Sequence, residues 1–263
     1  MDTREQGQIK EQVQQQFGKN AEKYVTSQRH AKGADLSELT ELARAEGAAT
    51  ALDIATGGGH VANALAAFIE QVTACDLTQE MLEQAQNFVQ GNGRANVRFV
   101  QEDAETLSFA DGSFDLAACR IAAHHFPNPD AFAREVNRVL KPGGCFLLID
   151  NVGPEDDELD RFYNELEKQR DHSHVRAWKK SEWISRLERS GFVLETLKAY
   201  PKPFEFQGWT ERMGLSGEQI ESLAKLFSDA PEAMQKHFHL EYENGHITGF
   251  QGEAILVKAR KRI

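Results

Sequence analysis

Short apolar runs alternate with longer amphipathic segments in the first 150 residues of the chain. The apolar runs have the length of buried strands and cover residues 51–54, 71–75, 97–100, 116–120 and 145–149. Segments with helical spacing separate most of them, at residues 60–69, 79–91 and 131–140. This alternation predicts an α/β fold, with a mainly parallel sheet and helices on both of its faces. Ligands of such sheets bind beyond the carboxyl ends of the strands.

The pattern differs before and after this region. Leucines at helical spacing from 36 to 42 follow a polar stretch, and two helices, 155–171 and 180–190, precede a sixth strand at 192–200. An aromatic-rich insertion then leads to a last apolar run at 252–259. We expect a single domain over 1–263, made of an N-terminal helical arm (1–47), a cofactor-binding core (48–150), helices and a sixth strand (151–200), a candidate substrate cap (201–249) and a last strand (250–263).

Composition narrows the function classes. The 263 residues are 40% hydrophobic and 27% charged, which is ordinary for a soluble globular protein. There is no long apolar run, so we expect a cytoplasmic protein without membrane insertion. A formal net charge of −11 argues against nucleic acid as a partner. The three cysteines fall in predicted buried strands and show no CxxC spacing, so we expect reduced thiols and no metal site.

A glycine-rich turn follows the first predicted strand. The sequence from Ala51 reads ALDIATGGGH and opens an apolar helical pattern, which is typical of a nucleotide-binding strand-to-helix turn. Gly57 and Gly59 suit it because glycine tolerates a positive φ and lets a ligand approach the backbone. With Asp76 about 20 residues further on, the spacing also fits the dinucleotide fingerprint. The turn alone therefore leaves an NAD-dependent oxidoreductase open.

Three other features favour S-adenosyl-L-methionine as the cofactor. Asp53 lies within the end of the first strand, where a cationic aminoacyl sulfonium ligand has a use for a carboxylate. Asp103 closes the third apolar run, at the same predicted edge of the sheet. The segment 140–144, LKPGG, predicts a turn between a helix and the fifth strand.

Together these motifs resemble the class I S-adenosylmethionine-dependent methyltransferases, in the branch of the ubiquinone and menaquinone biosynthesis methyltransferases. The resemblance rests on the motifs DIATGGG (53–59), DL (76–77), DAE (103–105), SFD (113–115) and LKPGG (140–144). It implies a Rossmann-like seven-stranded sheet, mostly parallel, whose last strand runs antiparallel between the fifth and the sixth. It also implies that the N-terminal arm lies over the cofactor. Ala55 stands where the family usually has glycine, so we expect a slightly altered turn.

The carboxylates at the strand ends have predicted roles in holding the cofactor. Asp76 is placed to accept from both ribose hydroxyls, with Leu77 against the adenine and Thr78 as the cap of the next helix; capping by Asp76 itself is the alternative. Asp103 is predicted to accept from the adenine amino group, or else to be an ordinary turn residue. Asp53 either orients the glycine turn through the backbone or meets the ammonium group.

Five further residues are candidates for binding the cofactor. Ala104 is predicted to supply a backbone N–H to the adenine ring, and Met81 lies on the helix that follows Asp76. Arg120 lies at the end of the fourth strand. Tyr24 and His30 of the arm are candidates through the resemblance, for closing the cofactor pocket.

Two histidines follow the fourth strand, where the methyl group and its acceptor should meet. His125 or His124 could act as a general base, because imidazole titrates near neutral pH. We expect one ring of the pair to face away from the site. The alternative is that both only pack and cap before the next helix.

The function predicted from the sequence is methylation of a small molecule. An aromatic or quinone-like acceptor is favoured by the aromatic insertion and by the family branch. An NAD-dependent oxidoreductase and a non-catalytic S-adenosylmethionine-binding protein are the alternatives. We expect a monomer or a homodimer.

Overall fold

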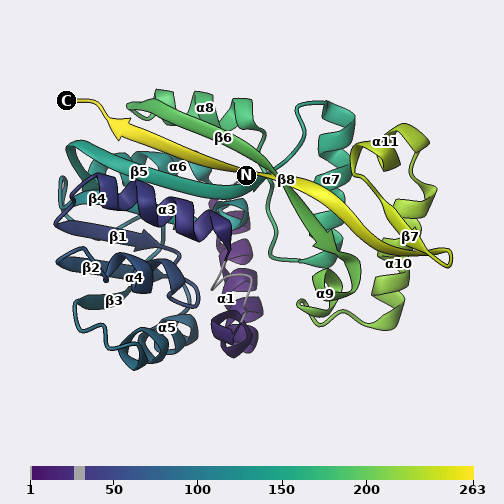
Figure 1. The fold of residues 1–263 in the computed structure, drawn as a ribbon, viewed down its shortest axis with the longest axis horizontal. Coiled ribbons are helices and arrows are strands. Elements are labelled where there is room, and N and C mark those ends of the chain that lie inside the picture. The colour runs from purple at the N-terminus through teal and green to yellow at the C-terminus, as the bar shows by residue number, and fades with distance from the viewer. Residues whose placement is uncertain (1, 27–32) are drawn as a thin grey trace.

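The computed structural model describes the backbone of residues 2–26 and 33–263, and the side chains of residues 2–18 and 33–263. Figure 1 shows a sheet flanked by helices, and a smaller lobe into which the long strands β6 and β8 continue. The strands are β1 Thr50–Ile54, β2 Gln71–Asp76, β3 Val97–Gln101, β4 Phe114–Arg120, β5 Leu140–Val152, β6 Phe192–Glu205, β7 Glu241–Glu243 and β8 His246–Lys261. The helices are α1 Thr3–Thr26, α3 Ala34–Ala45, α4 His60–Leu65, α5 Gln79–Gly91, η1 Ala123–His125, α6 Pro129–Val139, α7 Asp157–Arg170, α8 Lys180–Arg189, α9 Phe206–Glu211, α10 Gly217–Asp229 and α11 Glu232–His237.

The sheet has the strand order β3-β2-β1-β4-β5-β8-β6, and β7 pairs with β8. The pairs among β1 to β5 are parallel, whereas β8 lies antiparallel between β5 and β6. This confirms the predicted α/β, Rossmann-like fold with an antiparallel last strand. The sheet has one strand more than the seven predicted, because the insertion adds the three-residue strand β7.

Alternate residues of the strands pack into two separate apolar layers, because successive side chains of a strand point to opposite faces. On β5, Cys145, Leu147 and Ile149 pack with α3 and α4, whereas Phe146 and Leu148 pack with α6 and α8. Both faces of the sheet are therefore buried, as in other parallel sheets. The three cysteines are buried and free, as expected of reduced thiols.

The segment 140–144 differs from its prediction. It belongs to β5, where Phe114 pairs with Leu140 and Leu116 pairs with Cys145. The register shift between these pairs makes an irregular, bulged start of the strand, and Gly143 takes a φ of +75° in it. The glycines thus permit a bulge within the strand rather than a separate turn.

The insertion 201–249 folds against α7. Most of its aromatic side chains, among them Trp209, Phe227 and Phe238, are buried with Tyr163 of α7 in a third apolar cluster. β6 and β8 extend beyond the predicted ends to pair with each other as far as Glu205 and Gly249, and so carry this lobe. The aromatic pattern that suggested a substrate cap is for the most part the core of the lobe.

Candidate active site

The glycine turn joins β1 to α4 through three residues in the left-handed region. Ala55, Gly57 and Gly59 have φ angles of +54°, +54° and +82°. A Cβ on Gly59 would come within 3.1 Å of Ala85 and Val89, so glycine at this position lets α4 pack closely against α5. Ala55 adopts this left-handed conformation without being glycine, at a cost of about 1–2 kcal/mol.

Asp53 ties this turn to the helix that follows it. Its Oδ2 accepts from Thr56 Oγ1 at 2.6 Å and from the backbone N–H of Ala62 at 2.9 Å. The side chain is buried, and burial raises its pKa to about 7. Of the two roles predicted for Asp53, these contacts correspond to the orientation of the turn through the backbone.

Asp76, at the end of β2, faces the turn from the neighbouring strand. Its carboxylate accepts from the backbone N–H groups of Gly57 and Thr78, each at 3.0 Å. Removal from bulk water raises the pKa of Asp76. Thr78 stands at the N-cap of α5, but its side chain makes no capping hydrogen bond there, contrary to the prediction. It is the Asp76 carboxylate that accepts from the Thr78 backbone.

The helix α1 covers this region and contributes residues that the sequence analysis did not identify. Lys10 Nζ donates to Asp103 Oδ2 at 2.6 Å and pairs with Glu105, and Gln14 Nε2 donates to the carbonyl of Leu77 at 3.0 Å. Residues 10, 13, 14 and 17 share one face of a helix, so the spacing holds a signal for this contact. The described part of the N-terminal arm, α1, thus lies over this region, as the family resemblance implies.

These elements enclose a cavity that we call the glycine-turn pocket. Nine predicted cofactor residues line it, namely Asp53, Ala55, Gly57, Asp76, Leu77, Met81, Asp103, Ala104 and Arg120. His125, predicted as a base, lines it as well. Gly59 is outside this lining and shapes the turn instead. The side chain of Tyr24 and the whole of His30 lie outside the described residues.

A second cavity, which we call the histidine pocket, lies beside the first. The two share Phe17, Arg120, Ile121 and His125 in their linings. Arg120 is held by two hydrogen bonds to Asp35, at 2.7 and 3.0 Å. Ile121 has a φ of +56°, an unusual conformation for a β-branched residue. Strained residues of this kind gather at functional sites.

Both predicted histidines line the histidine pocket, and His125 also lines the glycine-turn pocket. His124 Nδ1 lies 2.6 Å from Asp150 Oδ1, and His125 Nδ1 lies 3.0 Å from the carbonyl of Ser173. The ring centroids are 4.2 Å apart. Burial, and repulsion from His124, lower the pKa of His125 to about 4. His125 is therefore a neutral ring at pH 7.

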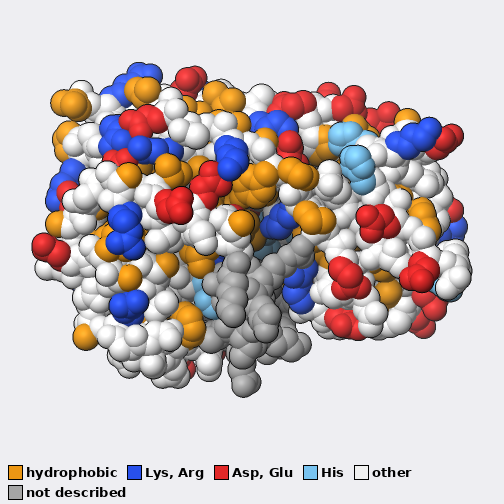
Figure 2. Space-filling view, in the orientation of Figure 1, with side chains coloured by type: hydrophobic (Ala, Val, Ile, Leu, Met, Phe, Trp, Pro, Cys, Tyr) orange, Lys and Arg blue, Asp and Glu red, His pale blue; other side chains and the backbone are white. Residues whose placement is uncertain are grey.

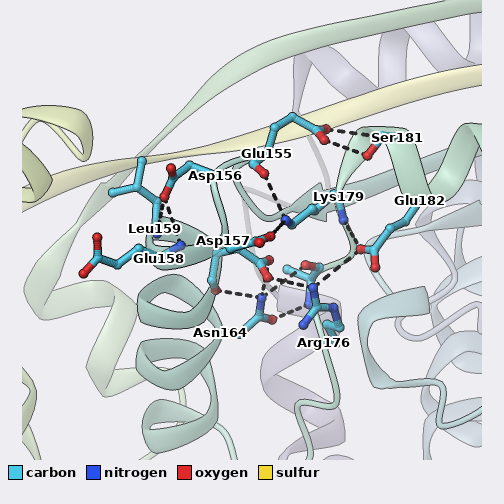
Figure 3. Close-up of polar contacts among 12 residues, drawn as sticks. Glu155, Asp156, Asp157, Glu158, Leu159, Asn164, Arg176, Lys179, Ser181 and Glu182 are labelled. Carbon is cyan, nitrogen blue, oxygen red and sulfur yellow. Dashed lines mark hydrogen bonds and ion pairs between the residues drawn. The ribbon is translucent and has the colours of Figure 1, made fainter.

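The segment between α7 and α8 is held by polar contacts to these two helices, and Figure 3 shows those of Arg176 and Lys179. Arg176 donates to Asp160 at 2.7 Å, and the backbone of Ala177 donates to Asn164 at 2.7 Å. Lys179 Nζ donates to the carbonyl of Glu155 at 2.9 Å. From this segment, the backbone N–H groups of residues 175 and 176 donate to the carbonyl of His124, at 2.9 and 3.0 Å. The histidine backbone is thereby locked in place.

Comparisons with known proteins agree with this geometry. The family model described as "Methyltransferase domain" matches residues 52–148. An uncharacterised methyltransferase of Bacillus subtilis, YcgJ, is 37% identical over 247 residues, which is 94% of this chain and 98% of that protein. The chain belongs to the class I S-adenosylmethionine-dependent methyltransferases. A crystal structure described as a methyltransferase of Bacillus halodurans has 48% sequence identity to this methyltransferase and superposes with a TM-score of 0.86. The match covers 88% of this chain and 100% of the other.

The resemblance to the quinone branch is more distant. The ubiquinone/menaquinone biosynthesis C-methyltransferase UbiE of Rhodopseudomonas palustris (strain BisB5) is 30% identical over 165 residues, 59% of this chain and 61% of that protein. Family membership resolves the ambiguity of the glycine turn in favour of a methyltransferase over an oxidoreductase.

The described residues contain no group of three or more His, Cys, Asp or Glu side chains arranged to hold a metal ion. No helix among them is long and apolar enough to cross a membrane. The face seen in Figure 2 carries both signs of charge, and acidic side chains are spread over the smaller lobe.

Proposed function

We propose that this methyltransferase transfers a methyl group from S-adenosyl-L-methionine to a small molecule. The observation that carries the proposal is the contact of the two pockets along one shared wall, next to the glycine turn. The glycine-turn pocket would hold the methyl donor, and the histidine pocket would hold the acceptor. Methyl transfer needs the two side by side and shielded from water, and such alignment can supply about 7–11 kcal/mol of the barrier.

The residues of the glycine-turn pocket fit the donor chemically. Asp76, at the end of β2, would accept from the ribose hydroxyls, since a carboxylate can accept further hydrogen bonds beyond the two from the backbone. Asp103 can accept from the adenine amino group even while Lys10 holds one of its oxygens. Leu77 and Met81 would pack against the adenine, and the N–H of Ala104 would reach the ring. The donor supplies a methyl group already activated by a positive sulfur.

The acceptor is proposed to be aromatic or quinone-like. Phe17 and Phe204 line the histidine pocket, so a planar ring bound there would have aromatic neighbours. The names of the UbiE relatives point to the same chemistry, at lower identity. Four cationic side chains line this pocket and suit an acceptor that carries or develops negative charge, namely Arg120, Arg170, Lys202 and Arg212.

The test is transfer of a labelled methyl group from S-adenosyl-L-methionine to a panel of quinols, phenols and small amines. We expect labelled product and stoichiometric S-adenosylhomocysteine with at least one quinol or phenol. Binding of the donor without transfer to any acceptor would favour a non-catalytic S-adenosylmethionine-binding protein instead. Cytoplasmic location, and a monomer or homodimer, remain part of the proposal.

A further inference from the structure

His124 and Asp150 form a buried pair in the wall of the histidine pocket. His124 Nδ1 and Asp150 Oδ1 are 2.6 Å apart, and the residues are 6% and 0% exposed. Asp150 lies in β5 between β4 and β8, and the same oxygen accepts from the backbone N–H of Asn151 at 2.8 Å. A carboxylate can only accept, so the ring donates through Nδ1, and the neutral form of the ring keeps its lone pair on Nε2.

The Nε2 atom of His124 has no hydrogen-bond partner among the described residues. The ring cannot easily turn to find one, because Asp150 holds Nδ1 and the segment after α7 holds the backbone carbonyl. His124 also lines the histidine pocket. The wall of this pocket therefore contains an imidazole that is held in place through its Nδ1.

The titratable groups around this ring come from several elements. Besides Asp150, they are His125 of η1, Asp171 and His174 of the segment after α7, Glu167 and Arg170 of α7, and Arg120 of β4. Burial lowers the pKa of His125 to about 4 and the pKa of His174 well below its usual value. His125 also lacks a carboxylate within hydrogen-bond distance, since its Nδ1 contacts Ser173. Of the three rings, His124 alone has a carboxylate at its Nδ1.

We propose that His124 is the general base of the methyl transfer, that Asp150 positions it, and that the acceptor's reacting atom carries an acidic proton. This inference rests on the proposed function. The proton of the acceptor's O–H or activated C–H passes to Nε2 of His124. The electron pair left on that oxygen or carbon forms the bond to the methyl carbon, and the pair of the broken carbon–sulfur bond stays on sulfur. The imidazolium that results lies against the Asp150 carboxylate.

The first test is NMR of the protein labelled with ¹⁵N in histidine, without donor or acceptor. We expect one ring with a protonated Nδ1 in a strong hydrogen bond and an unprotonated Nε2. This signal should be absent from His124→Gln, altered in Asp150→Asn, and present in His172→Gln, a control that replaces an exposed histidine nearby. Persistence of the signal in His124→Gln, or its absence from the wild type, would overturn the assignment.

The second test is methyl transfer with two kinds of acceptor. Phenols and 1,3-diketones carry an acidic proton on the reacting atom, whereas pyridine and dimethyl sulfide carry none. For a phenol or diketone substrate we expect His124→Gln and Asp150→Asn to lower kcat by about 10²–10⁴-fold, with a much smaller change in KM. His172→Gln should match the wild type. Asp150→Asn is nearly isosteric, so it serves if His124→Gln does not fold.

The outcomes separate the inference from the proposed function. Wild-type rates in a folded His124→Gln, or transfer confined to pyridine and dimethyl sulfide, would contradict the role of His124. Absence of transfer by the wild type to every acceptor would contradict the proposed function, while the NMR signal would still decide whether His124 and Asp150 share a proton.

Discussion

Replacement of Gly59 by alanine tests the packing that shapes the glycine turn. Gly59 has a φ of +82°, and a Cβ on it would lie 3.1 Å from both Ala85 Cβ and Val89 Cγ2. The backbone conformation costs an alanine about 1–2 kcal/mol. Overpacking of the α4–α5 contact adds about 1–3 kcal/mol. We therefore expect the free energy of unfolding to fall by about 2–5 kcal/mol, measured by urea denaturation with circular dichroism.

Gly47 provides a matched control for this substitution. Its φ is +63°, and a Cβ there would have no atom within 4 Å. Gly47→Ala should therefore cost only the backbone term, about 1–2 kcal/mol. Equal losses in the two variants would refute the reasoning, because they would show that the approach of α4 to α5 is not what requires glycine at position 59.

Two further predictions concern the carboxylates at the strand ends. Asp76→Ala should weaken S-adenosyl-L-methionine binding by about 10–150-fold in calorimetry, since hydrogen bonds to a charged group are worth about 1.5–3 kcal/mol. His125→Ala should bind the cofactor normally. Equal losses of affinity in the two variants would contradict the ribose role of Asp76 and the assignment of His125 outside cofactor binding. For Asp53, the folded-state pKa of about 7 lies above its ordinary value of 3.8, so its contribution to stability is present at low pH and is lost as the pH rises toward 7. Asp53→Asn should flatten the free energy of unfolding between pH 4 and 8, and an unchanged pH profile would count against the raised pKa.

Local patterns in the sequence were sufficient to predict the sheet and its ligand edge. The strands β1 to β4 are short and bounded by turn residues, so their carboxyl ends could be located within a residue or two. Asp53, Asp76 and Asp103 follow from that, and all three line the glycine-turn pocket. The bulge in β5 could not be foreseen, because the same glycines permit a turn or a bulge and only pairing with β4 distinguishes them.

The partners that complete the site are distant in the sequence. His124 meets Asp150 across 26 positions, and His125 meets Ser173 across 48. Such contacts arise from the order of the strands and leave no local motif. Asp150 ends a strongly apolar run within β5, as Asp53 does within β1, and this pattern is a sequence signal for Asp150. The aromatic insertion was open to two interpretations, because aromatic residues at helical spacing fit a core as well as a pocket.

The most direct test of the central claim is calorimetric titration of the wild-type protein with S-adenosyl-L-methionine, S-adenosylhomocysteine and NAD under the same conditions. We predict that the two sulfur ligands bind at one site with micromolar affinity and that NAD gives no heat of binding. Binding of NAD without either sulfur ligand would contradict the assignment of the glycine-turn pocket.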